Sequence, residues 1–169
     1  MIMKNVIKNE TGASLVEILI AILLFGIILA SIILGFTNVA RSEHNARVRG
    51  QAINLAREGI EAIYVLAEDN WNTIASASTG SPYHVEGDTG EWELVTNAEN
   101  LGEYTREITF ENAIRDVDGN LDDDGTLDVA AGDYEDDETK IITVTISWNS
   151  FGKAFDYSQQ TIFSNWKEI

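Results

Sequence analysis

The sequence predicts an α+β fold in which a long N-terminal helix packs against a four-stranded antiparallel sheet. Two observations support this prediction. Apolar residues dominate, or recur with helical spacing, up to about residue 71, and beyond it they alternate with polar residues in short runs. The chain of 169 residues also contains only one Pro, which favours long regular elements. We therefore expect one domain with an N-terminal helical appendage.

The first element, residues 13–36, is expected to be a membrane-spanning helix. Glu17 is its only charged residue, and a helix of this length measures about 36 Å, whereas the hydrocarbon core of a bilayer is about 30 Å thick. Lys4 and Lys8 precede the helix, and most of the acidic residues follow it. The positive-inside rule therefore places the N-terminus in the cytoplasm and the C-terminal domain outside it.

Residues 37–71 are expected to continue the helix with an amphipathic pattern. One apolar stripe recurs at steps of three and four residues and consists of Ile53, Ala56, Ile60, Ile63 and Ala67. Gly59 on this face would allow the sheet to approach closely. The helix is expected to end near residues 68–71, before the Ser/Thr/Gly/Pro-rich stretch 76–84.

Residues 72–169 are expected to form a globular antiparallel β domain. The strand candidates are residues 91–96, 104–111, 140–148 and 154–163. In the clearest of them, Ile142, Val144 and Ile146 alternate with Thr and Ser residues. An antiparallel sheet with one apolar face and one hydroxyl-bearing face would be suited to packing on a single helix.

An acidic insert, residues 112–139, separates the second and third strand candidates. Eleven of the 28 acidic residues lie between positions 116 and 138, with no Lys or Arg among them. Asn120, Asp122, Asp124 and Asp128 have the spacing of the first ligands of a calcium loop, with Asp116 and Asp118 as alternates. The closing Glu of that pattern is missing. The insert is therefore expected to be either a loose Ca²⁺ loop or a solvated acidic loop.

The junction between the N-terminal residues and the apolar helix reads Gly12-Ala13-Ser14-Leu15-Val16-Glu17. A carboxylate inside a membrane helix costs about 2.5–3.5 kcal/mol on insertion scales, so Glu17 needs a partner. An α-amino group created by cleavage after Gly12 would supply one. Alternatively, Glu17 reaches the aqueous boundary of the membrane by itself.

Taken together, these residues resemble the prepilin class III signal of type IV pilins and pseudopilins. A short basic leader, residues 1–12, ends in Gly, and Glu17 is the fifth residue after it. The resemblance implies a pilin fold, cleavage between Gly12 and Ala13 by a prepilin peptidase, and N-methylation of Ala13. It also implies that Glu17 pairs with the N-terminal amine of a neighbouring pilin subunit during assembly of a helical filament.

The resemblance further implies an inner-membrane assembly platform as a partner. The chain would be a single-pass plasma (inner) membrane protein before assembly and part of a pilus at the cell surface afterwards. Residues 52–71 and 161–169 are similar to minor pilins of the PilV-like kind. The chain departs from the common pattern in having Ala13 instead of Phe, Leu34 instead of Pro, and no Cys.

The sequence favours a structural subunit over an enzyme or a nucleic-acid-binding protein. With 28 acidic and 11 basic residues, the formal charge of −17 opposes binding to phosphate backbones. The chain lacks the nucleophile-elbow, phosphate-loop and zinc-protease motifs. No cofactor is required, although Ca²⁺ is allowed. The alternatives are a type II secretion pseudopilin and an unprocessed, membrane-anchored calcium-binding or adhesion module.

Overall fold

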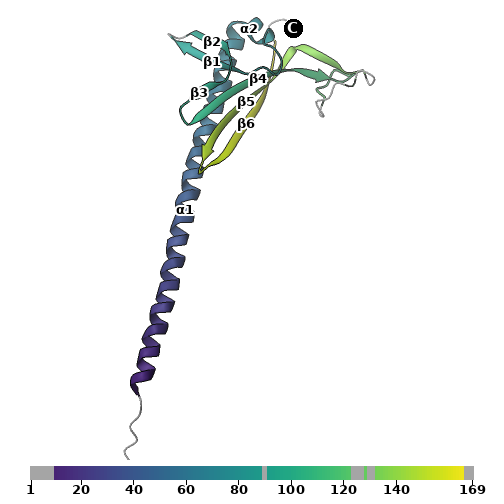
Figure 1. The fold of residues 1–169 in the computed structure, drawn as a ribbon. Helices are drawn as coiled ribbons and strands as arrows, with labels where there is room; N and C mark the ends of the chain where they lie inside the picture. The colour runs from purple at the N-terminus through teal and green to yellow at the C-terminus, as the bar shows by residue number, and fades with distance from the viewer. Residues whose placement is uncertain (1–9, 89–90, 123–127, 129–131, 166–169) are drawn as a thin grey trace, which may run out of the picture. The chain divides into compact units, whose positions relative to one another are not determined.

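The computed structural model describes residues 10–88, 91–122, 128 and 132–165 (Figure 1). The chain divides into two compact units, Met1–Ala46 and Arg47–Ile169. Helix α1, Glu10–Asp69, contributes its first part to the first unit and its last part to the second. The predicted α+β class is confirmed, because the C-terminal part of this N-terminal helix packs on an antiparallel sheet within the second unit.

Among the residues that the structure describes, the sheet contains six strands, so the prediction of four was wrong. A short helix, α2, spans Trp71–Ala75, and the strands are β1 Tyr83–Asp88, β2 Glu91–Thr96, β3 Glu99–Leu101, β4 Tyr104–Arg115, β5 Tyr134–Ser150 and β6 Lys153–Ser164. The strand order is β2-β1-β4-β5-β6, β3 pairs with β4 beside this path, and every pairing is antiparallel. The four predicted strands correspond to β2, β4, β5 and β6.

The two strands that the sequence did not predict are β1 and β3. β1 contains His, Glu, Gly and Asp, which are weak strand formers, and it follows Pro82 in a stretch with turn composition. It forms because its whole length pairs with β2. β3 has three residues, too few for an alternating pattern to be recognised.

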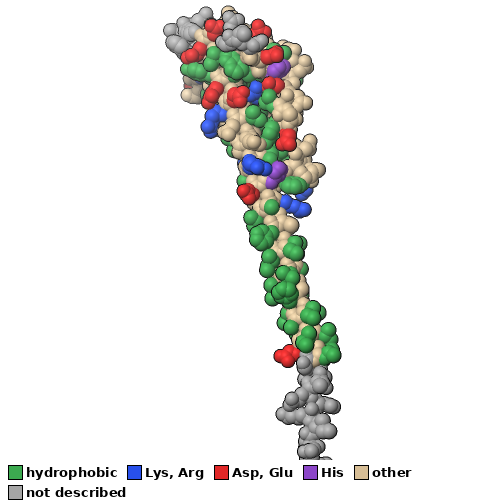
Figure 2. Space-filling view, turned by 90° about the vertical axis from the view of Figure 1, so that its left-hand side faces the viewer, with side chains coloured by type: hydrophobic (Ala, Val, Ile, Leu, Met, Phe, Trp, Pro, Cys, Tyr) green, Lys and Arg blue, Asp and Glu red, His purple; other side chains and the backbone are tan. Residues whose placement is uncertain are grey.

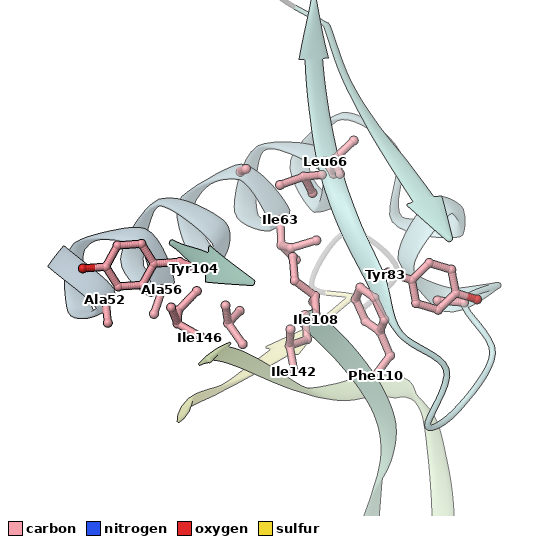
Figure 3. Close-up of a cluster of buried hydrophobic side chains, with 14 of the residues drawn as sticks. Ala52, Ala56, Ile63, Leu66, Tyr83, Tyr104, Ile108, Phe110, Ile142 and Ile146 are labelled. Carbon is pink, nitrogen blue, oxygen red and sulfur yellow. The ribbon is translucent and has the colours of Figure 1, made fainter. Parts of the chain in front are cut away.

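Small side chains line the face of α1 that packs on the sheet. Val48, Ala52, Ala56, Ile63 and Leu66 are buried, and Figure 3 shows members of this row facing the side chains of the sheet. The predicted stripe lay on this side of the helix, but its centre is shifted, since Ala52 and Ala56 are fully buried whereas the predicted Ile53 and Ile60 are half-buried. Small residues let the helix and the sheet approach closely.

Gly59 lies where α1 packs closely on the sheet. A Cβ atom at this position would lie 3.2 Å from Val144 Cγ1 and 3.3 Å from Arg106 Cδ, which is tighter than ordinary van der Waals contact. The expectation that this glycine permits close packing is therefore confirmed.

The sheet supplies the other half of the core through the alternating residues of β4 and β5. Ile108, Ile142, Val144 and Ile146 are fully buried, while the intervening Thr and Ser residues face away from α1. One apolar and one hydroxyl-bearing face are present, as the sequence predicts for residues 140–148. Tyr83 of β1 meets Phe110 of β4 edge-on, with ring centroids 5.5 Å apart, and extends the core toward α2.

Strands β4 and β5 both extend into the predicted acidic insert. β4 continues to Arg115 and β5 begins at Tyr134, with a bulge between Asn112 and Ala113. The Asn112 amide donates to Glu135 and Asp137, and its carbonyl oxygen accepts from Lys140. These contacts give two carboxylates of the insert, Glu135 and Asp137, a hydrogen-bond donor beside the bulge.

Candidate functional site

The described part of the first unit is a helix whose apolar surface is exposed on every side. Every residue from Leu15 to Glu43 is exposed, and Figure 2 shows hydrophobic side chains along the length of this helix. A helix that is apolar all around has no single packing face, so it requires an apolar surrounding. Among the described residues, α1 is the one helix long and apolar enough to cross a membrane.

The hydroxyl groups within this apolar segment are satisfied by the helix itself. Ser31 Oγ donates to the carbonyl oxygen of Ile27 at 2.8 Å, and Thr37 Oγ1 donates to that of Leu34 at 2.9 Å. A polar side chain bonded to its own helix has little need of water. These two residues therefore do not oppose placement of the segment in an apolar surrounding.

Glu17 is the one acidic residue within the apolar segment. It is exposed, and it has no hydrogen-bond or ion-pair partner in the part of the chain that the structure describes. The predicted cleavage positions Gly12 and Ala13 have helical backbone near the start of α1, and the structure describes neither their burial nor their contacts. The role of Glu17 in assembly therefore stays a prediction.

The second candidate site is the turn at residues 116–120, called the acidic turn below, which begins where β4 ends. Asp116 Oδ1 accepts from the backbone N–H groups of Asp118 and Asn120 at 3.0 and 2.8 Å, and Oδ2 accepts from the Asn120 amide at 3.2 Å. The hydrogen bonds from Asn120, first from its side chain and then from its backbone, lower the pKa of Asp116. Asp116 therefore closes a tight turn with its carboxylate already bonded.

Arg115 provides a positive charge beside this turn. Its Nε donates to Asp136 Oδ2 at 2.5 Å, and its two terminal nitrogens donate to the Gly119 carbonyl at 2.8 Å and to Thr139 Oγ1 at 3.2 Å. Burial raises the pKa of Asp136, but hydrogen bonds from Arg115, Thr139 and the backbone of Glu138 outweigh it, so the pKa lies below its ordinary value. One cation thus links the turn to β5.

The remaining predicted calcium ligands are only partly brought together. The backbone N–H of Asp122 donates to the Ile114 carbonyl, and the backbone N–H of Asp128 donates to Asp133 Oδ2 at 3.0 Å. Asp124 lies outside the described residues. Within the described ranges, no three His, Cys, Asp or Glu side chains form a group suited to a metal ion. The acidic turn keeps Asp116, Asp118 and Asn120 together, and the calcium loop remains a prediction.

Sequence reasoning missed the contributions of Asp116 as a turn acceptor and of Arg115 as its cation. The first had a local signal, because Asp followed by Gly and Asn within four residues is typical of a turn closed by the Asp side chain. The contribution of Arg115 had no local signal, because its partners Asp136 and Thr139 are more than 20 positions away along the chain.

The structure also contains a groove of about 470 Å³ beside the acidic turn. Its lining combines aliphatic side chains of β4, β5 and β6 with carboxylates; the lining residues are Thr79, Glu111, Asn112, Ile114, Leu121, Asp122, Glu135, Ile141, Gln160 and Ile162. Aliphatic and acidic groups together suit a ligand that is both apolar and cationic.

Comparisons of the chain with family models, with curated proteins and with solved structures found no match. The features of the chain that bear on its function are therefore the exposed apolar helix and the packed unit that follows it.

Proposed function

We propose that the chain is a structural subunit, a minor pilin, of a type IV pilus-like filament, processed after Gly12 and assembled through its N-terminal helix. The observation that supports this most is the exposure of every residue from Leu15 to Glu43. Such a surface requires lipid or equivalent helices around it. The leader motif of residues 1–12 then distinguishes a filament subunit from an ordinary anchored protein.

In this mechanism, the apolar helix is held in the inner membrane before assembly and contacts the helices of other subunits afterwards. Lipid contacts are exchanged for helix–helix contacts, so the apolar surface is covered in both states. The carboxylate of Glu17 would pair with the α-amino group of Ala13 of a neighbouring subunit. That pair would satisfy the one charge of the apolar segment and would favour one axial position of the incoming subunit over others.

Two other functions remain as alternatives. A type II secretion pseudopilin would use the same processing and the same helix. An unprocessed, membrane-anchored binding module is favoured by a different observation, the groove beside the acidic turn, which is lined by aliphatic and acidic side chains. The N-terminus of the mature chain separates this module from both filament subunits.

The test is mass spectrometry of the chain isolated from cells that contain a prepilin peptidase. We expect a chain that begins at N-methylated Ala13, and we expect Gly12→Val to remain uncleaved. Gly26→Val is the matched control, since no described atom lies within 4 Å of a Cβ built there. It should be cleaved like the parent chain. A parent chain that keeps Met1 beside an active peptidase would contradict the proposal.

A further inference from the structure

The turn between β5 and β6 places an aromatic residue in an unusual backbone conformation. Ser150 pairs with Lys153, so the loop consists of Phe151 and Gly152, with φ angles of 50° and 76°. Two-residue hairpin loops with positive φ at both positions favour Asn-Gly or Asp-Gly, because these residues tolerate the left-handed region. A Phe at the first position is therefore unfavourable for the turn itself.

Phe151 is also exposed: 64% of the residue is accessible to solvent, which is unfavourable for an aromatic ring. Phe155 is 40% exposed and stacks on Trp148 with ring centroids 5.9 Å apart. Lys153 lies between the two Phe residues and is also exposed. Phe151, Lys153 and Phe155 are called the aromatic tip below. A strained and exposed aromatic residue is accessible to a contact outside the chain.

The aromatic tip lies at the end of the second unit where the chain enters it. The Trp148 ring is 6.1 Å from the Tyr104 ring, and the Tyr104 hydroxyl donates to the Val48 carbonyl at 3.1 Å. Val48 is the second residue of this unit. Only residues 37–46 separate the apolar segment from the unit, and even a fully extended chain of this length spans at most about 35 Å. The tip is therefore tethered near any membrane that contains the apolar segment.

The charges of the second unit favour the same orientation. β5 begins at Tyr134, beside the acidic turn, and ends at Ser150, roughly 50 Å away at the usual rise of a strand (Figure 1). The segment 116–138 contains eleven acidic residues and no basic one. At the opposite end, charges of both signs are present: Glu103 and Arg47 lie near Tyr104, and Lys153 and Asp156 lie in the first part of β6. An anionic membrane surface repels the acidic end and leaves the aromatic tip as the end that can approach it.

We propose that the aromatic tip inserts into the headgroup region of the bilayer that holds the apolar helix. Aromatic rings favour the membrane interface, and a Lys side chain there contacts anionic headgroups while its alkyl part remains in the apolar layer. The partner of this surface is thus a lipid surface. The inference depends on the membrane span of the proposed function, and it is independent of cleavage and filament assembly.

The experiment uses the full chain in vesicles of phosphatidylcholine and phosphatidylglycerol. Because the natural chain has no Cys, Asn149→Cys gives one attachment site for a fluorophore beside the tip, and Asp137→Cys gives one at the acidic end. We expect lipid-attached quenchers to quench the label at position 149 and to leave the label at 137 bright. Quenching at 149 should not change when the protein-to-lipid ratio is lowered.

The matched variants are Phe151→Asn and Val117→Asn, since Val117 is 65% exposed at the acidic end. Asn suits the left-handed turn position, so Phe151→Asn removes the ring without weakening the hairpin. It should abolish quenching at 149, whereas Val117→Asn should retain it.

Equal quenching at 149 and 137 in a chain that resists alkaline extraction overturns the inference and leaves the proposed function intact. Quenching at 149 that falls as the protein is diluted in lipid also overturns it, because the occupant is then a second copy of the chain. An uncleaved N-terminus with a quenched tip counts against the filament alone.

Discussion

Replacement of Arg106 tests how the helix and the sheet are held together. Its side chain is 3% exposed, and its Nε and Nη2 donate to Glu99 Oε2 at 2.9 and 2.5 Å, while Nη1 donates to the Leu55 carbonyl at 3.4 Å. Arg106→Ala leaves the Glu99 carboxylate, 25% exposed, without its partner and opens a cavity beside Gly59. We expect a loss of about 3–5 kcal/mol in the free energy of unfolding.

Two further variants separate the charge from the packing. Arg106→Met keeps most of the volume next to Gly59, so it should lose less than Arg106→Ala. Adding Glu99→Gln to Arg106→Met removes the unpaired carboxylate, so the double variant should be more stable than Arg106→Met alone. Arg106 also forms an ion pair with Glu58, whose Oε1 lies 3.7 Å from Nη1. Because the Glu58 side chain is 59% exposed, this pair should contribute little to the differences in stability.

The measurement is thermal unfolding of the full chain in detergent, followed by near-ultraviolet circular dichroism. A loss of this size lowers the midpoint by roughly 10 °C or more in a unit of this length. Arg57→Met, at an exposed position of the same helix, is the control and should change the midpoint little. The reasoning is refuted if Arg106→Ala matches that control, or if the double variant is less stable than Arg106→Met.

Three further predictions concern the charged sites. Because Asp136 has a lowered pKa, its contribution to stability is present above its ordinary pKa of about 4 and is lost as the pH falls through the lower folded value. Asp136→Asn should therefore destabilise the chain by about 1–3 kcal/mol at pH 7 and by progressively less as the pH falls below about 4, whereas the exposed Asp156→Asn should change little over this range. A loss for Asp136→Asn that does not shrink as the pH falls would contradict this. If the insert binds Ca²⁺ with millimolar affinity, a tenfold excess over the dissociation constant should add about 1.4 kcal/mol and raise the unfolding midpoint relative to a chelator; an unchanged midpoint counts against calcium. Glu17→Ala should insert into membranes at least as well as the parent chain but enter filaments poorly, measured as the ratio of sheared filament protein to membrane protein; normal incorporation would remove its proposed role in assembly.

Much of the fold follows from patterns that the sequence displays locally. β5 is recognisable because Ile142, Val144 and Ile146 alternate with hydroxyl residues, and α1 because its apolar residues keep a helical period. β1 depends on pairing with β2 rather than on its own composition, so a reading of single segments does not find it. The exact centre of the buried helix face depends on how closely the sheet approaches, and that distance is set by Gly59 and by the sheet together.

The candidate site was predictable only where one segment contains all of its groups. The apolar helix lies in one continuous stretch, and its described residues from Leu15 onward form a long helix with apolar residues on every side. The acidic turn depends on Arg115 meeting Asp136 and Thr139 across the β4–β5 pairing. Ligand spacing indicated Asn120 as a calcium ligand, and it did not reveal that the Asn120 side chain also donates to Asp116.

The place of β5 in the sheet has a consequence for the timing of folding. β5 is the strand between β4 and β6, yet it lies between residues 134 and 150 of a chain of 169. The buried face of α1 therefore has no complete sheet to pack on until almost the whole chain has been synthesised. Contacts such as that between Tyr104 and Val48 also join residues 56 positions apart, which slows their formation. The second unit should thus remain unfolded, and able to pass through a narrow channel as an extended chain, until its last two strands emerge.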